Sequence, residues 1–431
     1  MRGSRDRVRR IHGLVAQHLR VTATKPRPDS LPLTTGGFGA PEVNAAIDAL
    51  LAQQTTMGPG VSRFEAAWTA YQAAAGSIMV NSGSSANLVA VATLLDPTGP
   101  RPFRPGDEVI VPAVTWSTTI FPLQQLGLVP VLVDVDPATL NLAAEAIERA
   151  LSKKTRGIVA VHLLGNPCDM PAILALARRR RLAVIEDCCE AHGAMVGGTR
   201  VGSFGDLGTF SFFFSHHITT MEGGMITTRR RGLLPLLISQ RAHGWSRGRP
   251  DEQALRRRHA SIDPRFLFVT TGFNVRPTEL NAAFGLHQLP RLEAFIAARR
   301  RNHRHWLRAL AGFGDLFLFQ EERPGTRHSA FGFSILIRPG APFTRREMMN
   351  YLEAHRVETR PIAGSNMARQ PAMKLWPRRL ASRRLPGADW VHERGLFVGN
   401  HADVTAEQRE HFVRVVRGFV ASRGASPGNR R

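Results

Sequence analysis

The stretch Ile78-Met-Val-Asn-Ser-Gly-Ser-Ser-Ala-Asn87 joins a short apolar strand to the beginning of a helix. Small residues at such a junction let backbone amides approach an anion, and the first turn of a helix attracts negative charge. The stretch therefore predicts a strand-turn-helix unit with a phosphate site at the turn. The same residues also fit an ordinary helix cap, which occurs in many α/β proteins.

Strand-like and helical segments alternate on both sides of this unit, from about Pro41 onward. Apolar runs rich in β-branched residues are separated by helix-length stretches, a pattern that predicts βαβ units and an α/β fold with a mostly parallel sheet. The ligand crevice of such a sheet lies beyond the carboxyl ends of its strands. The expected strands are Ile78–Val80, Glu108–Val111, Val129–Val133, Gly157–Val161, Leu182–Ile185 and Thr209–Phe213, and the expected helices include Ser85–Leu95, Leu142–Ser152 and Met170–Arg180.

The sequence predicts a basic arm at residues 1–40, a large domain at residues 41–290 and a smaller domain at residues 291–431. The arm lacks the apolar core of a secretory signal, and we expect it to be irregular. Residues 247–265 are charged and show little periodicity, which predicts an exposed loop. The smaller domain should be of the α+β type, with a helix at Leu292–Leu310, a strand at Phe331–Ile337 and helices around Arg345–His355 and Ala406–Arg423.

The chain of 431 residues carries a formal net charge of +23, which raises the question of nucleic acid. Only four residues are lysines, so the excess is almost entirely arginine. No helix-turn-helix, zinc or single-strand-binding pattern accompanies it, and we expect solvated basic faces that attract an anionic substrate rather than nucleic acid. The main arginine clusters are Arg178–Arg181, Arg229–Arg231, Arg256–Arg258 and Arg299–Arg301.

Cysteine usage and hydropathy exclude several other classes of protein. The three cysteines, Cys168, Cys188 and Cys189, give neither a disulfide framework nor metal-ligand spacing, so we expect no metal site and a reducing, cytoplasmic location. No run of about 18 apolar residues is present, so the sequence predicts no membrane span.

Polar side chains that follow the predicted strands are candidates for chemistry. Trp116 follows one strand, where it could be a core residue or a platform on which a ring stacks. Asp187 ends another strand, where it could cap the next helix or keep a pyridinium nitrogen protonated. Ser211 and the pair His216-His217 follow an aromatic strand and precede Glu222-Gly-Gly. We expect these side chains to converge at one edge of the sheet.

Taken together, these motifs resemble the DegT/DnrJ/StrS aminotransferase family of fold-type I pyridoxal-phosphate (PLP) enzymes, over about residues 41–419. The resemblance implies a large domain with a mostly parallel seven-stranded sheet, and a homodimer whose active sites lie at the subunit interface. It also implies that Trp116 stacks on the cofactor ring and that Asp187 pairs with the ring nitrogen, with Glu190 close by. Within one chain, the implied phosphate contacts are Ser84 and Ser85 of the stretch Ser82–Ala86, together with Ser211. Asn274, in Phe273-Asn-Val-Arg-Pro277, is implied to reach the phosphate in the neighbouring subunit. The implied substrate contacts are His243 and Arg276.

One departure from the family pattern concerns the catalytic residue. The aminotransferases carry a lysine six residues before the glutamate of Glu-Gly-Gly, and counting back from Glu222 gives His216 instead. This substitution is similar to the branch of PLP-dependent sugar 3-dehydratases of the colitose pathway. It implies C3 deoxygenation of a nucleotide-linked 4-keto-6-deoxyhexose, expected to be GDP-4-keto-6-deoxymannose. It also implies pyridoxamine phosphate (PMP) as the starting cofactor form, L-glutamate as the amino donor and release of ammonia.

The chemistry of imidazole agrees with this substitution. A lysine both moves the cofactor C4′ proton and releases an amino sugar, whereas imidazole can do only the first. With an unperturbed pKa near 6.5, His216 suits removal of that proton and protonation of the leaving C3 oxygen. We expect His217 to be structural.

Other readings of the same residues stay open. A second histidine-type branch uses an iron–sulfur cluster, which normally takes four thiolates, so three cysteines argue against it. The alternatives that remain are an enzyme of the same scaffold acting on another nucleotide sugar or natural product, and a non-catalytic binding protein.

Overall fold

The computed structural model describes residues 2–22 and 27–424, and its larger part is built on an eight-stranded sheet. The strand order is β1-β9-β8-β5-β4-β2-β3-β14, and β9 is the one strand that runs against its neighbours. The expected α/β fold with a mostly parallel sheet is therefore confirmed. The strands are β1 (Gly76–Val80), β2 (Glu108–Pro112), β3 (Val129–Val133), β4 (Thr155–Val161), β5 (Ala183–Asp187), β8 (Leu207–Ser211), β9 (Gly224–Thr228) and β14 (Arg379–Leu380).

Seven of these strands, the number that the family resemblance implies, come from residues 76–228, and β9 among them was not among the six strands expected from the sequence pattern. The eighth strand, which was not expected, comes from far along the chain. β14 pairs in parallel with β3, and Arg379 in it forms an ion pair of 2.9 Å with Glu108. Met373 nearby packs in the same hydrophobic cluster as the large sheet. Part of the C-terminal region thus completes the large sheet, and the division at residue 290 stays a prediction.

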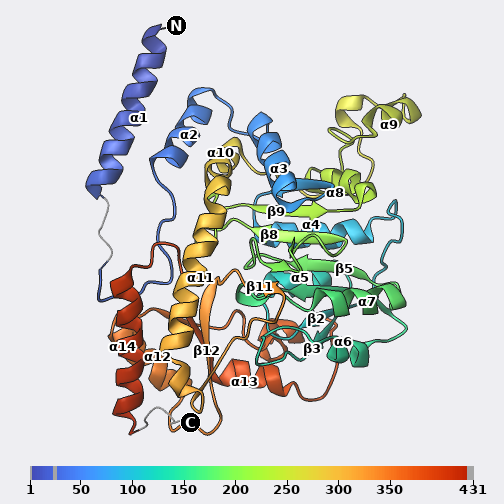
Figure 1. The fold of residues 1–431 in the computed structure, drawn as a ribbon. Helices are drawn as coiled ribbons and strands as arrows, with labels where there is room; N and C mark the ends of the chain where they lie inside the picture. The colour runs from blue at the N-terminus through green and yellow to red at the C-terminus, as the bar shows by residue number, and fades with distance from the viewer. Residues whose placement is uncertain (1, 23–26, 425–431) are drawn as a thin grey trace.

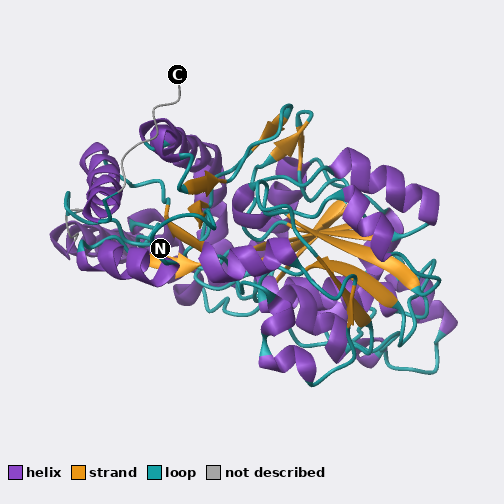
Figure 2. Ribbon diagram, turned by 90° about the horizontal axis from the view of Figure 1, so that it is seen from below, coloured by secondary structure: helices purple, strands orange, loops and turns teal. Residues whose placement is uncertain are grey.

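Alternation of side chains along the strands fills the spaces above and below the sheet, because successive residues point to opposite faces. Val109 and Val111 pack beneath α4, α5 and α8, whereas Ile110 between them packs against α6 and α7. Figure 2 shows the strands enclosed between these two helical layers. The helices are α3 (Pro59–Gln72), α4 (Gly83–Leu95), α5 (Ser117–Gln125), α6 (Ala144–Ala150), α7 (Met170–Arg180), α8 (Leu234–Arg241) and α10 (Glu279–Gln288).

The smaller part of the molecule is an antiparallel sheet covered by helices, in agreement with the expected α+β type. Its core contains Trp306, Phe333 and Phe412, whose rings meet edge to face. In Figure 1, helix α11 runs from the large part into this one and lies beside α14. The sheet order is β10 (Phe317–Phe319), β12 (Gly332–Ile337), β15 (Gly395–Gly399), β13 (Thr359–Pro361), and the helices are α11 (Leu292–Ala309), α12 (Arg345–Ala354), α13 (Pro386–Arg394) and α14 (Ala406–Ser422).

Two segments expected to be irregular contain helices. Residues 2–22 form α1 (Arg2–Thr22), which contacts α2 (Ala40–Leu51), and His12 lies 2.9 Å from Asp48 across that contact. The prediction of an irregular arm was therefore wrong for α1; residues 23–26 lie outside the described residues. The exposed loop at residues 247–265 contains α9 (Glu252–Arg258), a helix with no buried residue. No helix in the described part of the chain is long and apolar enough to cross a membrane.

Candidate active site

A cavity of about 540 Å³, which we call the main cavity, lies at the carboxyl ends of β2, β4, β5 and β8. Polar side chains reach it from strands that are far apart in the sequence, as the parallel arrangement predicts. Six of the residues predicted for the site line this one cavity: Ser84, Trp116, Asp187, Glu190, Ser211 and His216.

The turn that opens α4 forms one wall of the main cavity. Ser82 caps the helix, because its Oγ accepts a hydrogen bond of 3.0 Å from the backbone N–H of Ser85. Gly83 lies so close to β8 that an added Cβ would stand 2.5 Å from the Cβ of Ser211, so only glycine fits there. This close approach brings Ser84 and Ser211 to the same wall of the cavity, beside backbone N–H groups of the first helical turn that have no partner within the helix. The Ser85 hydroxyl instead donates to Asn81 at 2.6 Å, and Ser85 does not line the cavity.

Asp187 presents a buried carboxylate to the main cavity. The residue is 5% exposed, and no ion pair joins it to a cation within the described residues. Its oxygens accept hydrogen bonds from Asn87 (2.9 Å), Thr119 (2.8 Å) and the N–H of Cys189 (3.1 Å). These neutral donors hold the group in place but leave its charge uncompensated. A carboxylate in this state fits the protonated ring nitrogen of PLP.

Trp116 and Glu190 complete this side of the main cavity. Trp116 is 60% exposed while it lines the cavity, which rules out the alternative that it is a core residue. Its ring is free to stack on a flat ligand. Glu190 accepts a hydrogen bond of 2.8 Å from the N–H of Leu164. Burial, with a contribution from the charge of Asp187, raises the pKa of Glu190 to about 7.

His216 faces the main cavity from the segment that follows β8. Its ring packs edge-on against Phe331, with the centroids 5.2 Å apart, and its Nδ1 has no hydrogen-bond partner in the described part of the chain. Burial, together with the charge of Arg299, lowers the pKa of His216 to about 3. The imidazole is thus neutral at physiological pH and able to accept a proton. His217 is 2% exposed, and its Nε2–H donates to the carbonyl of Ser329 at 3.1 Å, in agreement with a structural role.

Arg299 on α11 joins the His216 segment to the smaller part of the molecule. Its guanidinium donates to the carbonyl oxygens of His216 (3.1 Å), Phe331 (3.0 Å) and Asn400 (2.5 Å). The residue is 4% exposed, so its assignment to a solvated basic face was wrong. Nothing local in the sequence marks Arg299, because its partners come together only in the folded chain.

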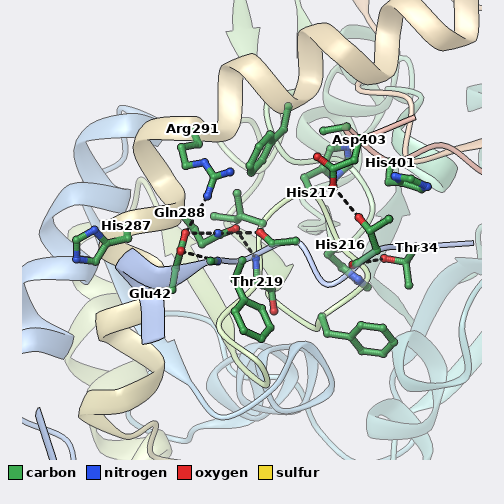
Figure 3. A pocket seen from close by; sticks show the side chains of 18 of the residues that line it. Thr34, Glu42, His216, His217, Thr219, His287, Gln288, Arg291, His401 and Asp403 are labelled. Atoms are coloured by element: carbon green, nitrogen blue, oxygen red, sulfur yellow. Dashed lines mark hydrogen bonds and ion pairs between the residues drawn. The ribbon is translucent and has the colours of Figure 1, made fainter. Parts of the chain in front are cut away.

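A second cavity, also of about 540 Å³, meets the main cavity at His216. One wall is the segment from Thr34 to Glu42. Figure 3 shows His216, His217, His401 and Asp403 near Thr34, away from Glu42, and Thr35 donates a hydrogen bond of 2.7 Å to Asp403. Glu42 fixes the N-terminal segment to the end of α10 through Gln288 (2.6 Å) and to the turn before α11 through Arg291 (3.0 Å). Sequence reasoning assigned no role to residues 34–42.

Three predicted contact residues lie outside both cavities. Asn274 is exposed, and its Oδ1 accepts a hydrogen bond of 3.0 Å from Nε of Arg276. Arg276 lies 5.6 Å from the ring centroid of Trp245, and His243 packs edge-on against the same ring at 4.7 Å. The structure thus gathers Asn274, His243 and Arg276 into one group that the site of their own chain does not use.

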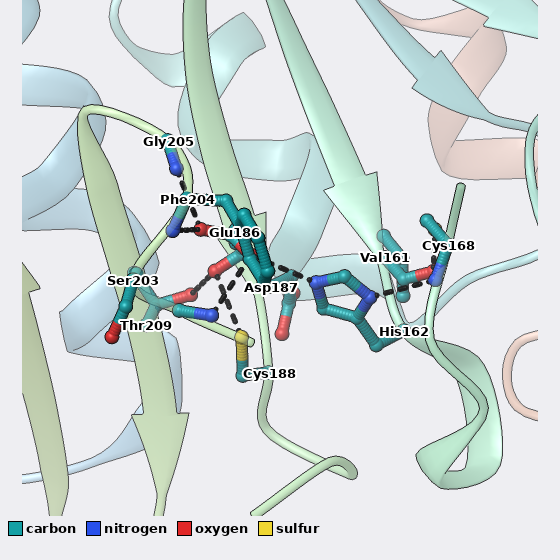
Figure 4. Close-up of polar contacts among 12 residues, drawn as sticks. Val161, His162, Cys168, Glu186, Asp187, Cys188, Ser203, Phe204, Gly205 and Thr209 are labelled. Carbon is teal, nitrogen blue, oxygen red and sulfur yellow. Dashed lines mark hydrogen bonds and ion pairs between the residues drawn. The ribbon is translucent and has the colours of Figure 1, made fainter. Parts of the chain in front are cut away.

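A buried histidine–carboxylate–thiol group, missed in the sequence, lies next to Asp187. One ligand atom each of His162, Glu186 and Cys188 lies within 4.8 Å of the others, which is close enough to hold a metal ion. Figure 4 shows that these atoms already have partners: Glu186 accepts from three backbone N–H groups and from His162. The His162 Nδ1 accepts from the N–H of Cys168 at 3.0 Å, and burial raises the pKa of Cys188 to about 12. These contacts form a buried hydrogen-bonded network that supports the main cavity from below.

Comparison with known proteins identifies the class of protein. The model of the DegT/DnrJ/EryC1/StrS aminotransferase family matches residues 38–417. The chain belongs to this family.

Similar proteins carry more specific names. The chain is 38% identical to GDP-4-keto-6-deoxy-D-mannose 3-dehydratase of Yersinia pseudotuberculosis, over 90% of this chain and 98% of that one. It is 37% identical to dTDP-4-dehydro-2,6-dideoxy-D-glucose 3-dehydratase of Saccharopolyspora spinosa, over 88% and 84%. A crystal structure of GDP-4-keto-6-deoxymannose-3-dehydratase with a trapped PLP–glutamate geminal diamine superposes with a TM-score of 0.83 at 34% identity, covering 90% and 100% of the two chains. The fold-type I architecture is thereby confirmed.

Proposed function

We propose that this chain is a PLP-dependent sugar 3-dehydratase that removes the C3 hydroxyl of a nucleotide-linked 4-keto-6-deoxyhexose. Its relatives of known name support the reaction class, and GDP-4-keto-6-deoxymannose is the first substrate to test. The observation that carries the proposal is that His216 shares the main cavity with the buried, uncompensated carboxylate of Asp187.

The residues of the main cavity fit PLP and PMP. Asp187 would pair with the ring nitrogen, Trp116 would cover the ring, and Ser84 and Ser211 would hold the phosphate at the first turn of α4. When bound, the cofactor supplies an electron sink for the charge that remains after a proton leaves C4′. L-Glutamate as the amino donor is supported by the similar structure that contains a PLP–glutamate adduct.

His216 is proposed to move the proton in this reaction. Because its imidazole is neutral, it can accept the C4′ proton and then give it to the departing C3 oxygen. An imidazole cannot make the covalent bond to the cofactor that a lysine amine makes, so release of an amino sugar is not favoured. Loss of the C3 hydroxyl and release of ammonia follow as the outcome.

Two other side chains of the main cavity suit the substrates. Arg360 of β13 is the one guanidinium in its described lining, and it would attract the carboxylates of glutamate or a sugar diphosphate. Glu190, with a pKa near neutrality, can exchange a proton beside Asp187.

The assembly belongs to the same proposal. The group of Asn274, His243 and Arg276, which lies outside both cavities of its own chain, is suited to complete the site of a second copy in a homodimer. Asn274 would then be directed at the phosphate and the other two at the substrate. We place the enzyme in the cytoplasm, since three free cysteines fit a reducing compartment.

A second candidate is the same dehydration on a dTDP-linked sugar. The Saccharopolyspora relative with that name is 37% identical, against 38% for the GDP-linked relative. Parallel assays with GDP-linked and dTDP-linked 4-keto-6-deoxyhexoses decide between the two.

An absorbance titration tests the scaffold independently of turnover. The protein should bind PMP saturably, with a spectral change that is lost or weakened in Asp187→Ala. Addition of GDP-4-keto-6-deoxymannose to the PMP form should then change the spectrum in one turnover without added glutamate. A protein that binds PMP but responds to neither nucleotide sugar would refute the substrate assignment, and one that does not bind PMP would refute the proposed cofactor.

A further inference from the structure

A third cavity, of about 360 Å³, lies on the opposite edge of the large sheet from the main cavity. It is bounded by the beginnings of β4 and β5, at Thr155 and Ala183, and by Asp206 just before β8. The main cavity lies at the carboxyl ends of the same strands. The two cavities are therefore separated by the length of the sheet, and no residue lines both.

Five arginines and one carboxylate line this cavity, which we call the arginine cleft. The carboxylate of Asp206 is already engaged by Arg230 and by the N–H of Val184 at 2.8 Å. Three of the arginines each form an ion pair with a carboxylate: Arg156 with Asp107 (3.8 Å), Arg180 with Glu148 (3.9 Å) and Arg230 with Asp206. The lining arginines are Arg101, Arg156, Arg180, Arg181 and Arg230.

Two of these guanidinium groups are not used by the fold. Arg101 and Arg181 are exposed, and neither side chain has a hydrogen bond or an ion pair within the described residues. Arg180 lies 3.9 Å from Glu148, a carboxylate that Arg179 already holds at 2.6 Å. The arginine cleft consequently carries positive charge that no acidic group among residues 2–22 and 27–424 neutralises.

Behind the arginines, the arginine cleft is closed by Thr93 and by apolar side chains. Thr93 is 1% exposed, and its Oγ1 has no hydrogen-bond partner in the part of the chain described. Phe103 and Leu233 supply buried apolar surface in the same cavity. Pockets of about 300 Å³ and more, apolar within and with a few placed polar groups, are typical of sites for small ligands.

We propose that the arginine cleft is a second ligand site, which binds a nucleoside diphosphate. Arg101 and Arg181 would hold the diphosphate, since a guanidinium matches phosphate oxygens in geometry and charge. The apolar surface at Phe103 and Leu233 would take the sugar or the base. Because this site shares no residue with the main cavity, its occupancy does not depend on the reaction proposed above.

Calorimetric titration of the full chain saturated with PLP tests this site. The probes are GDP and inorganic pyrophosphate, and the variant is Arg101→Ser/Arg181→Ser. The matched control is Arg178→Ser/Arg301→Ser, which removes the same charge from exposed positions outside the cleft. An unchanged cofactor spectrum shows that each variant is folded.

Wild-type protein should bind pyrophosphate saturably, and GDP more tightly because of the apolar surface. The cleft variant should lose about tenfold or more in pyrophosphate affinity, as expected when two charged hydrogen-bond donors are removed. The control should change about twofold at most. Equal losses in both variants would show general attraction to a basic surface and overturn the proposal. Absence of saturable pyrophosphate binding would overturn it as well, whatever the outcome of the dehydratase assays.

Discussion

The guanidinium of Arg299 donates a hydrogen bond of 3.1 Å to the backbone carbonyl of His216. The same guanidinium holds the carbonyl of Phe331, whose ring packs against the His216 imidazole. A second hydrogen bond joins Asn400 to Arg299, because the side-chain amide of Asn400 donates to the backbone carbonyl of Arg299 at 3.1 Å. One buried arginine therefore fixes both the segment that carries His216 and the aromatic ring beside it.

Arg299→Lys should lower kcat about ten- to a hundredfold with little change in KM, because one ammonium cannot span three carbonyls and a small displacement of a catalytic group is costly. Burial lowers the pKa of His216 most, and the charge of Arg299 lowers it further. Arg299→Met removes that second contribution, so the acid limb of the pH profile should move to higher pH. The pH dependence of kcat measures this shift. Arg301→Lys, at an exposed position on the same helix, is the control. Superimposable profiles for wild type and Arg299→Met would leave Arg299 with a purely structural role.

Asp187→Asn keeps the shape of the side chain but removes its charge. PMP should bind more weakly and turnover should fall by about a hundredfold or more, because the cofactor ring loses the partner of its protonated nitrogen. Spectral titration and initial rates measure the two effects separately. Asp134→Asn, which alters the carboxylate that accepts from Gly387 and Ala388 away from the main cavity, should change neither. Wild-type affinity and rate in Asp187→Asn would remove this residue from the cofactor site.

Asn274→Ala and His216→Asn should each abolish activity as a pure protein, and mixed subunits should recover part of it. In a dimer of one chain of each kind, one site carries both substitutions and the other carries neither. Random mixing therefore predicts about a quarter of the wild-type activity after subunit exchange. Mixtures that stay inactive, with exchange shown by mass spectrometry, would mean that Asn274 does not act across an interface.

His192→Phe should stabilise the protein, more strongly at acid pH. His192 is fully buried against Trp68 and Phe210, and burial holds its pKa well below the usual value. The unfolded chain binds a proton at this histidine below about pH 6.5 while the folded chain does not, so stability falls as the pH decreases through that value. Urea midpoints at pH 5 and pH 8 measure the effect, with exposed His18→Phe as the control. Equal midpoint shifts at both pH values would contradict this assignment.

Most of the site could be predicted because its signals are local. Asp187 and Ser211 stand at the ends of apolar strands, so their convergence follows from the parallel sheet alone. Arg299 and β14 could not be found in this way, since their partners lie between 32 and 248 residues away in the sequence and are chosen by tertiary packing. Helix α1 did carry a signal: Ile11, Leu14, Val15 and Leu19 recur at helical spacing within a stretch dominated by its basic charge.

Ammonia release is the most direct test of the central claim, that His216 directs this scaffold to dehydration. Protein loaded with PMP is incubated with GDP-4-keto-6-deoxymannose, and ammonia and the 3-deoxy-4-keto sugar are measured with and without L-glutamate. The account predicts catalytic ammonia only with glutamate, about one equivalent per site without it, and neither in His216→Asn that still binds PMP. Formation of an amino sugar in place of ammonia, or full ammonia release by His216→Asn, would contradict it.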